Sequence, residues 1–246
     1  MKESNEITLL IVDDEASLRD AIVSDFKKKG FKVLEAVNGQ EAFKLLQSHP
    51  IDTILSDIKM PGGSGIELLA NVTDINPEYP SIILLTGFAE LSVEDAYEKG
   101  AVAFFGKPFN RKTLLETVYR TLSVKEERWN TKRDNVVSHL FLQLKAENLD
   151  KSILSKMINL GRGGMFFPVS VDQPPVESLV SFNISFDDTS SKSLEGQGII
   201  RWTRSKEAEN LPAGCGIEFT YLDTHSRDYV ISHINRSNFK AYIPKA

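Results

Sequence analysis

Acidic residues follow two apolar runs in the first half of the chain, where strands would end. Asp13 and Asp14 follow the run at 7–12, and Asp57 follows the run at 51–56. The carboxyl ends of parallel strands meet at one edge of a sheet, where open α/β sheets place their chemistry. Three carboxylates at one edge repel one another unless a cation lies among them, and hard oxygen ligands suit Mg²⁺. The spacing therefore predicts a magnesium site at this edge.

Two further polar groups are predicted at the same edge. Thr86 ends the apolar run at 81–86, and Lys107 comes just after the run at 101–105. A hydroxyl, an ammonium group and Mg²⁺ around one carboxylate would stabilise the three oxygens of a phosphoryl group on it. We therefore predict that Asp57 is a phosphoryl acceptor.

Each of these residues has a plainer interpretation when it is taken alone. Aspartates often cap helices, a lysine is usually solvated, and a threonine is an ordinary strand residue. A metal-dependent phosphatase is the enzyme alternative at this edge. Such an enzyme usually has a second acid close after its nucleophile, and Ile58 and Lys59 supply none.

The first half of the chain alternates between two kinds of segment. Short apolar runs that predict strands lie at 7–12, 31–37, 51–56, 81–86 and 101–105. The segments between them have apolar residues at helical spacing. Successive βα units of this length predict a doubly wound, five-stranded parallel sheet with helices on both faces, an α/β fold.

The second half changes character after residue 123. The polar segment at 123–135 is interpreted as a helix tail and linker. Strand-like runs separated by turn-forming clusters follow at 136–146, 152–160, 164–171, 177–186, 196–204 and 214–222. They predict a small antiparallel β-barrel, closed by a C-terminal helix that begins at Asp223 or Thr224. The predicted domains are residues 1–122 and 136–246, joined by the linker.

Composition limits the class of protein. With 246 residues, of which 41% are hydrophobic, the chain can hold one large domain or two smaller ones with buried cores. Cys215 is the only cysteine, so an internal disulfide or a cysteine metal cluster is excluded. No apolar stretch approaches the roughly 20 residues that span a bilayer. The first residues also lack the apolar core of a signal peptide, so we predict a cytoplasmic protein without membrane insertion.

Charge is unevenly distributed between the two halves. Residues 1–122 hold 13 Lys+Arg against 19 Asp+Glu, whereas residues 123–246 hold 16 against 15. The acidic first half disfavours nonspecific nucleic-acid binding, and the second half has no basic footprint. No helix-turn-helix pattern follows the first half. A transcriptional regulator is therefore disfavoured, and no DNA partner is predicted.

Residues 6–122 resemble a two-component receiver domain of the CheY type. The motifs that carry the resemblance occur in the family's order and spacing: "DD" at 13–14, "D…MPG" at 57–62, Thr86 and "KPF" at 107–109. The resemblance implies that a sensor histidine kinase, a phosphotransfer protein or a small phosphodonor phosphorylates Asp57. It implies no enzyme activity apart from self-catalysed phosphoryl transfer to and from that aspartate.

The same resemblance implies roles for individual residues. The implied magnesium ligands are Asp13, Asp14, Asp57 and the backbone carbonyl of Lys59. Thr86 would move toward the phosphoryl group, and Lys107 would contact it. Phe104 stands at the position of the family's switch aromatic, which is often Tyr, so it can pack inward but offers no hydroxyl. Receiver domains often dimerise, so the resemblance allows dimerisation.

Residues 126–240 resemble a PilZ domain, a small β-barrel family that binds cyclic di-GMP. The resemblance rests on "NLGRGGMFF" at 159–167, "GIIRWTR" at 198–204 and "GCGIEFTYLD" at 214–223, followed by the closing helix. A glycine-rich turn can offer backbone N–H groups to an anion. A tight barrel corner is its commoner meaning, so the turn alone is a weak signal.

The ligand motifs of the PilZ family are an RxxxR before the first strand and a (D/N)xSxxG turn. The implied nucleotide-binding residues are Arg128, Lys132, Arg133, Asn159, Gly161 and Gly164. Gly161 stands where the family has serine, and Lys132 stands where the second arginine of RxxxR would be. Lysine lacks the planar fork of arginine, and each lost bidentate or stacked contact would cost roughly 1–3 kcal/mol.

Two interpretations of the whole chain therefore stay open. The first is a response regulator phosphorylated on Asp57, with phosphorylation modulating a PilZ output domain that binds cyclic di-GMP. The second is a phospho-regulated adaptor whose degenerate PilZ domain binds an unknown downstream protein and no nucleotide. Trp129 and Trp202 could flank a ligand, although packing is their plainer interpretation.

Overall fold

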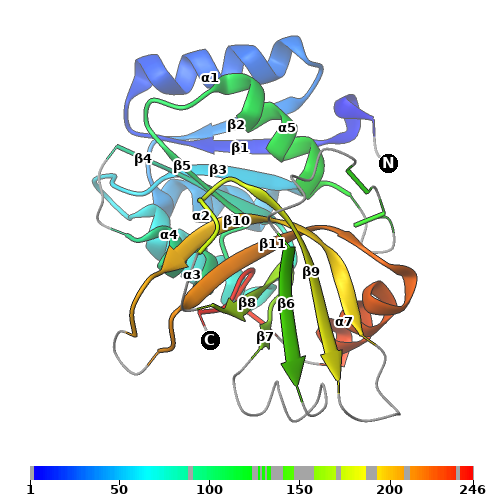
Figure 1. Ribbon diagram of the computed structural model, residues 1–246. Coiled ribbons are helices and arrows are strands. Elements are labelled where there is room, and N and C mark those ends of the chain that lie inside the picture. The colour runs from blue at the N-terminus through cyan, green and yellow to red at the C-terminus, as the bar shows by residue number, and fades with distance from the viewer. Residues whose placement is uncertain are drawn as a thin grey trace. The chain divides into compact units, whose positions relative to one another are not determined.

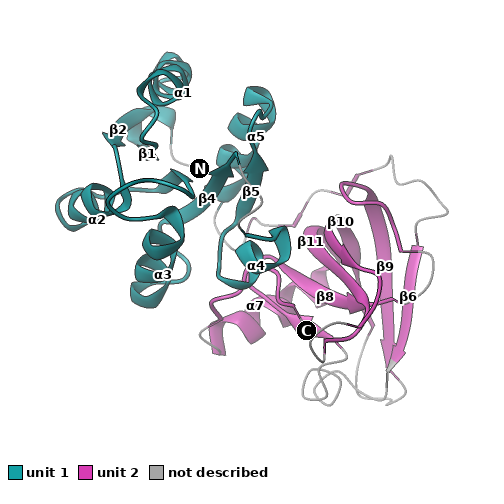
Figure 2. Ribbon diagram, turned by 90° about the vertical axis from the view of Figure 1, so that its left-hand side faces the viewer, with its two compact units in different colours: residues 1–124 teal, residues 125–246 magenta. Residues whose placement is uncertain are grey.

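The protein is described here from a computed structural model. The described residues are 3–87, 91–123, 127, 129–130, 132–133, 141–146, 158–169, 173–186, 193–207, 211–236 and 239–245. The chain forms two compact units, Met1–Val124 and Lys125–Ala246, which are described separately (Figure 2).

The first unit contains a parallel sheet. Its strands are β1 (Thr8–Val12), β2 (Lys32–Ala36), β3 (Thr53–Asp57), β4 (Ser81–Thr86) and β5 (Ala103–Gly106). They lie in the order β2-β1-β3-β4-β5, and every neighbouring pair is parallel. The central strands β1, β3 and β4 are buried along almost their whole length because both of their faces are covered. The predicted five-stranded sheet is confirmed.

Helices cover both faces of this sheet. They are α1 (Ala16–Lys28), α2 (Gly39–Ser48), α3 (Gly65–Ile75), α4 (Val93–Glu98) and α5 (Arg111–Thr121), preceded by the short 3₁₀ helix η1 (Ser4–Glu6). Helices α1 and α5 lie on one face, and α2, α3 and α4 lie on the other (Figure 1). Four helices begin after a side chain that accepts a first-turn N–H, namely Asn38, Ser64, Ser92 and Asn110. The doubly wound arrangement is confirmed.

The second unit is built on a curled, six-stranded half-barrel. Its strands are β6 (Phe141–Ala146), β7 (Asn159–Leu160), β8 (Gly164–Pro168), β9 (Leu179–Phe186), β10 (Leu194–Arg204) and β11 (Gly214–Leu222). Their order is β6-β9-β10-β11-β8-β7, and helix α7 (Thr224–Arg236) follows β11. The predicted barrel and C-terminal helix are confirmed.

One strand pair differs in direction from the antiparallel expectation. Strand β6 pairs parallel with β9, whereas the other pairs of this sheet are antiparallel. A parallel pair needs a crossover rather than a hairpin. Strands β7 and β8 lie between β6 and β9 in the chain, so that connection is long. The predicted strand residues 136–140 and 152–157 lie outside the described residues.

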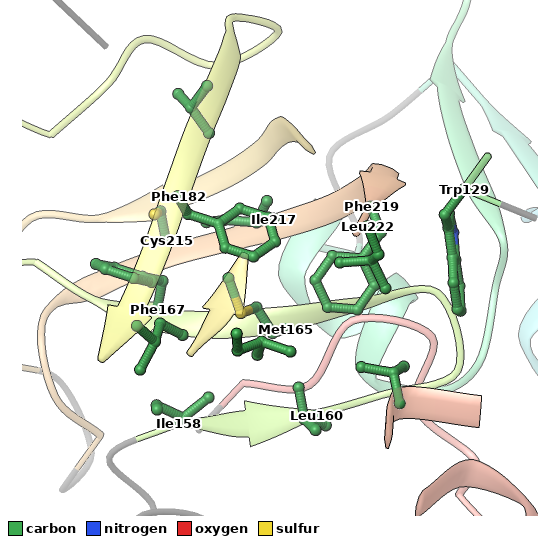
Figure 3. Close-up of a cluster of buried hydrophobic side chains, with 14 of the residues drawn as sticks. Trp129, Ile158, Leu160, Met165, Phe167, Phe182, Cys215, Ile217, Phe219 and Leu222 are labelled. Carbon is green, nitrogen blue, oxygen red and sulfur yellow. The ribbon is translucent and has the colours of Figure 1, made fainter. Parts of the chain in front are cut away.

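The core of the second unit contains alternate residues of its strands. Cys215, Ile217 and Phe219 of β11 all point into it (Figure 3). Trp129 also packs here, edge-to-face against Phe219 with ring centroids 5.5 Å apart. Trp129 is therefore a packing residue. Within the described parts of the chain, none of the helices has the length and apolarity needed to cross a bilayer.

Candidate functional site

The carboxyl edge of the first unit's sheet gathers three carboxylates. Asp13 directly follows β1 and is fully buried, and Asp57 is the last residue of β3 with 8% of its surface exposed. Asp14 is exposed. One carboxylate oxygen from each of the three lies within 4.8 Å of the others. The predicted convergence of these acids is therefore present in the fold.

Lys107 lies among these acids, directly after β5. Its Nζ donates to Oδ2 of Asp13 at 2.8 Å and lies 3.1 Å from Oδ2 of Asp57. One ammonium against three carboxylates leaves an excess of negative charge at the edge. A divalent cation with oxygen preference would offset that excess, so the residues fit Mg²⁺.

The pKa values of the central pair follow from this crowding. Burial raises the pKa of Asp57 above its ordinary 3.8, and the Asp13 charge adds to this, against the opposing effect of Lys107 and the Ile58 N–H. Burial by itself would lower the pKa of Lys107. The hydrogen bonds and charges of Asp13 and Asp57 outweigh it, so that pKa is raised. Lys107 is thus charged at neutral pH and is held between the two acids.

The loop after Asp57 explains the glycines in the sequence. Gly62 and Gly63 have φ of 83° and 118°, a region that favours glycine. A Cβ on Gly65 would collide with the carbonyl oxygen of Asp57. Glycine at this position therefore lets α3 begin directly against the end of β3. The Asp57 carboxylate is also held by the residue that follows it, because its Oδ1 accepts the Ile58 N–H at 2.8 Å.

The remaining residues predicted for this edge are found on or next to its strands. Thr86 ends β4, is 6% exposed and pairs with Gly106 of β5. Phe104, on β5, is half-buried and packs against the core beneath α2, α3 and α4. Lys59 is an exposed residue two positions after Asp57. The roles of these three residues stay predictions.

The glycine-rich turn of the second unit joins β7 to β8. Asn159 lies in β7, Gly164 begins β8, and the Gly161 N–H donates to the Gly164 carbonyl at 2.8 Å. The next two amides turn toward residues 239–245, which we call the closing segment. Arg162 N–H donates to the Ala241 carbonyl at 3.0 Å, and Gly163 N–H donates to the Tyr242 carbonyl at 2.9 Å. These backbone N–H groups, which the sequence analysis considered as anion donors, thus form hydrogen bonds within the chain.

The predicted basic residues of the linker are described only in part. Arg128 lies outside the described residues. Lys132 and Arg133 are exposed. The backbone of Arg133 forms two hydrogen bonds with the Gln197 side chain, of 2.8 and 3.0 Å, which tie this segment to β10. The nucleotide-binding roles of these residues stay predictions.

Trp202 lies in a stacked group on the face of the sheet opposite the core. Its ring stacks on Phe166 with centroids 6.1 Å apart, and the Arg204 guanidinium lies over both rings. Trp202 is 5% exposed and is therefore a packing residue, as its plainer interpretation predicts.

Sequence reasoning did not predict a role for the closing segment or for Arg204. The apolar run Tyr242–Pro244 after the last helix is the sequence feature that could have indicated a packed closing segment.

Comparison with known proteins also finds two parts in this chain, each similar to a different family. A family model for the response regulator receiver domain matches residues 9–119, and one for the PilZ domain matches residues 126–236. Sporulation initiation phosphotransferase F of Bacillus subtilis is 33% identical over 118 residues, which cover 48% of this chain and 94% of that protein. Chemotaxis protein CheY of the same organism is 37% identical over 117 residues, covering 47% and 97%.

A longer relative matches over a small part of its own length. An NtrX-like response regulator of Rickettsia felis is 31% identical over 153 residues, covering 61% of this chain, and the chain spans only 30% of that protein.

The parallel sheet with its acidic edge defines a receiver-type signalling domain. The chain belongs to the response regulators, and in it a receiver domain is followed by a PilZ domain.

Proposed function

We propose that this protein is a response regulator that is phosphorylated on Asp57, and that phosphorylation modulates its PilZ output domain. The observation that carries the proposal is the Lys107 ammonium, 2.8 Å from Asp13 and 3.1 Å from Asp57. It supplies a fixed positive charge beside the Asp57 carboxylate, where negative charge would develop during phosphoryl transfer.

The proposed reaction uses few groups of the protein. An Asp57 carboxylate oxygen forms a bond to the phosphorus of the donor, while the bond from phosphorus to the leaving group breaks and the leaving group keeps the electron pair. Mg²⁺, held by Asp13, Asp14, Asp57 and the Lys59 carbonyl, would offset charge on the phosphoryl oxygens when bound. Lys107 would contact a further oxygen, and Thr86 would donate its hydroxyl to another. Water later hydrolyses the acyl phosphate and restores Asp57.

The phosphoryl donor is proposed by chemical class. A sensor histidine kinase or a phosphotransfer protein presents a phosphohistidine, whose P–N bond is the one that breaks. Acetyl phosphate, a small phosphodonor, presents a mixed anhydride, in which the bond from phosphorus to the acyl oxygen breaks and acetate leaves. Self-catalysed transfer to and from Asp57 is the only reaction that we assign to the protein. Its partners would be cytoplasmic, which is the location that we propose for it.

The output would follow from repacking around the phosphoryl group. Phosphorylation adds charge and acceptor oxygens at the end of β3. Thr86 and Phe104 would then shift between two packings, and the change would pass through the segment after α5 to the PilZ domain. Cyclic di-GMP is the proposed output ligand, supported by the PilZ match over residues 126–236.

A second candidate for the output is a protein-binding adaptor that takes no nucleotide. It is favoured by one observation, since the amides of Arg162 and Gly163 already donate to carbonyls of the closing segment. In this case phosphorylation would change the affinity of the barrel for an unidentified downstream protein.

The phosphorylation proposal is tested with a small phosphodonor, acetyl phosphate, in the presence of Mg²⁺. We expect the mass of the intact protein to rise by one phosphoryl group, with Asp57→Asn abolishing the increase. Asp20→Asn is the matched control, because Asp20 is an exposed aspartate of α1 that is not part of the cluster of Asp13, Asp14 and Asp57. Equal incorporation by Asp57→Asn and the natural protein would overturn the assignment.

A further inference from the structure

The closing segment binds the glycine turn through its backbone. Its Ala241 and Tyr242 carbonyls accept the Arg162 and Gly163 N–H groups at 3.0 and 2.9 Å. Figure 1 shows this segment, in red, beside β7 and β8. These amides are neighbouring donors on one turn, the arrangement that binds a phosphate or another anion when it is open. The protein's own carbonyl oxygens therefore occupy the positions that anion oxygens would take.

Two arginines add side-chain contacts along the closing segment. Arg162 is 2% exposed, donates from Nε to the Lys240 carbonyl at 3.2 Å, and has its guanidinium 5.7 Å from the centre of the Tyr242 ring. Arg204 donates from Nη2 to the Lys245 carbonyl at 3.1 Å. Both guanidinium groups, which suit phosphate, are thus engaged by the segment.

Apolar contacts anchor the middle of the segment. Ile243 is fully buried. A Cβ on Gly163 would collide with the Tyr242 ring, and one on Gly164 would lie 2.9 Å from Cγ1 of Ile243. The turn and the segment therefore pack without space for a ligand between them.

The glycine at position 161, where the family motif has serine, is explained by the position of the closing segment. A Cβ at position 161 would lie 2.6 Å from the Tyr242 carbonyl oxygen and 3.0 Å from that of Ala241. Both are backbone atoms, which cannot move aside as a flexible side-chain end can. A serine at 161 and the closing segment thus cannot both keep these positions. The segment itself lies beyond residues 126–236, the part of the chain that matches the PilZ family.

We propose that the closing segment is an internal strap that occupies the anion-binding face of the glycine turn. A cyclic dinucleotide can place a phosphodiester on the Arg162 and Gly163 amides only after this strap has left. The inference rests on the proposed output domain and deepens it, because it makes nucleotide access depend on residues 239–245. It does not depend on the phosphorylation of Asp57.

The test is a calorimetric titration of cyclic di-GMP into the unphosphorylated full-length protein and two variants. Ile243→Ser removes the buried anchor of the strap. Ile234→Ser, on α7, places the same substitution in the barrel core and controls for general loosening. We expect Ile243→Ser to bind about tenfold more tightly than the natural protein, since the nucleotide no longer displaces the strap's hydrogen bonds. Ile234→Ser should bind no better than the natural protein.

Other outcomes of the titration overturn the proposal. Equal affinity in all three proteins would mean that the strap excludes nothing. No heat with any of them would mean that the strap is not what prevents binding, and would leave the adaptor as the output. Because phosphorylation is measured separately with acetyl phosphate, failure of the strap and failure of the response regulator assignment are distinguishable.

Two measurements keep the proposal testable if Ile243→Ser does not fold. Gly161→Ala sets a Cβ against the strap backbone without adding the family's hydroxyl, and it should also bind cyclic di-GMP about tenfold more tightly. Amide hydrogen exchange on the natural protein needs no variant. The Arg162 and Gly163 amides should exchange slowly, whereas exchange as fast as that of an open loop would contradict the occupied turn.

Discussion

Glycines follow Asp57 in the receiver domain and Leu160 in the PilZ domain, and in both places they allow backbone to approach closely. After Asp57, Gly65 lets α3 begin against the end of β3, and the carboxylate stays beside Lys107 with the exposed Asp14 nearby. After Leu160, the lack of side chains lets the closing segment pack against the turn, and carbonyl oxygens of that segment accept hydrogen bonds from the turn's amides. Glycines in a loop thus allow another group to pack closely against the backbone. The surrounding residues determine whether that group is a ligand or another segment of the chain.

The largest effect is expected for the lysine at the acidic edge, in comparison with a lysine on the surface. Lys107→Ala should slow phosphoryl incorporation from acetyl phosphate by about 10²-fold, because it removes the fixed cation that meets developing charge. Lys112→Ala is the control, since Lys112 is a solvated lysine of α5 with 84% of its side chain exposed. The comparison would fail if both variants reacted at the same rate.

The second prediction concerns Mg²⁺ and pH. At a concentration a hundredfold above its dissociation constant, Mg²⁺ should raise the free energy of unfolding by about 2.7 kcal/mol. This gain should shrink as the pH falls through the raised pKa of Asp57, because the protonated carboxyl cannot bind the ion. Thermal unfolding across pH measures it, and Asp13→Asn should reduce the gain at every pH.

Without Mg²⁺, the contribution of Asp57 to stability has the opposite direction with pH. A folded-state pKa above the ordinary 3.8 means that the folded protein holds this proton more tightly than the unfolded chain. Stability from this group is therefore greatest below 3.8 and falls as the pH rises through the raised value. An increase in stability with pH from Asp57, obtained by comparison with Asp57→Asn, would contradict the crowded acidic edge.

The last prediction tests the close approach at Gly65. Gly65→Ala should lower the free energy of unfolding of the receiver domain by about 1–3 kcal/mol, because its Cβ collides with the Asp57 backbone. Gly106→Ala is the matched control, since a Cβ there meets no atom within 4 Å. Denaturant unfolding of both variants measures the difference. Equal stability would mean that α3 does not depend on glycine at its start.

The receiver half was predictable because its signals are local and repeated. Four of the five strand runs ended at or close to a residue of the site, and parallel pairing brings those ends together whatever the details of the helices. The sequence could therefore predict that Asp13, Asp57 and Lys107 converge. It could not predict that Asp13 would be fully buried while Asp14 stays exposed, because that depends on the direction in which the chain leaves β1.

The PilZ half was predictable in its strands but not in its turn. Strand β11 and the start of α7 fall where alternation and turn residues predict them. The parallel pairing of β6 with β9 and the return of residues 239–245 to the turn both join segments far apart in the chain. Local patterns carry no information on such pairings, so a missing serine at Gly161 suggested only a lost contact.

The central claim is that phosphorylation of Asp57 changes the PilZ domain. Amide hydrogen exchange of the full-length protein, with Mg²⁺ and with or without acetyl phosphate, tests it directly. We predict that phosphorylation alters exchange at residues beyond 124 as well as around Asp57, and that Asp57→Asn abolishes both changes. A change confined to residues 1–124 would contradict the claim, because the receiver would then respond without passing its state to the output domain.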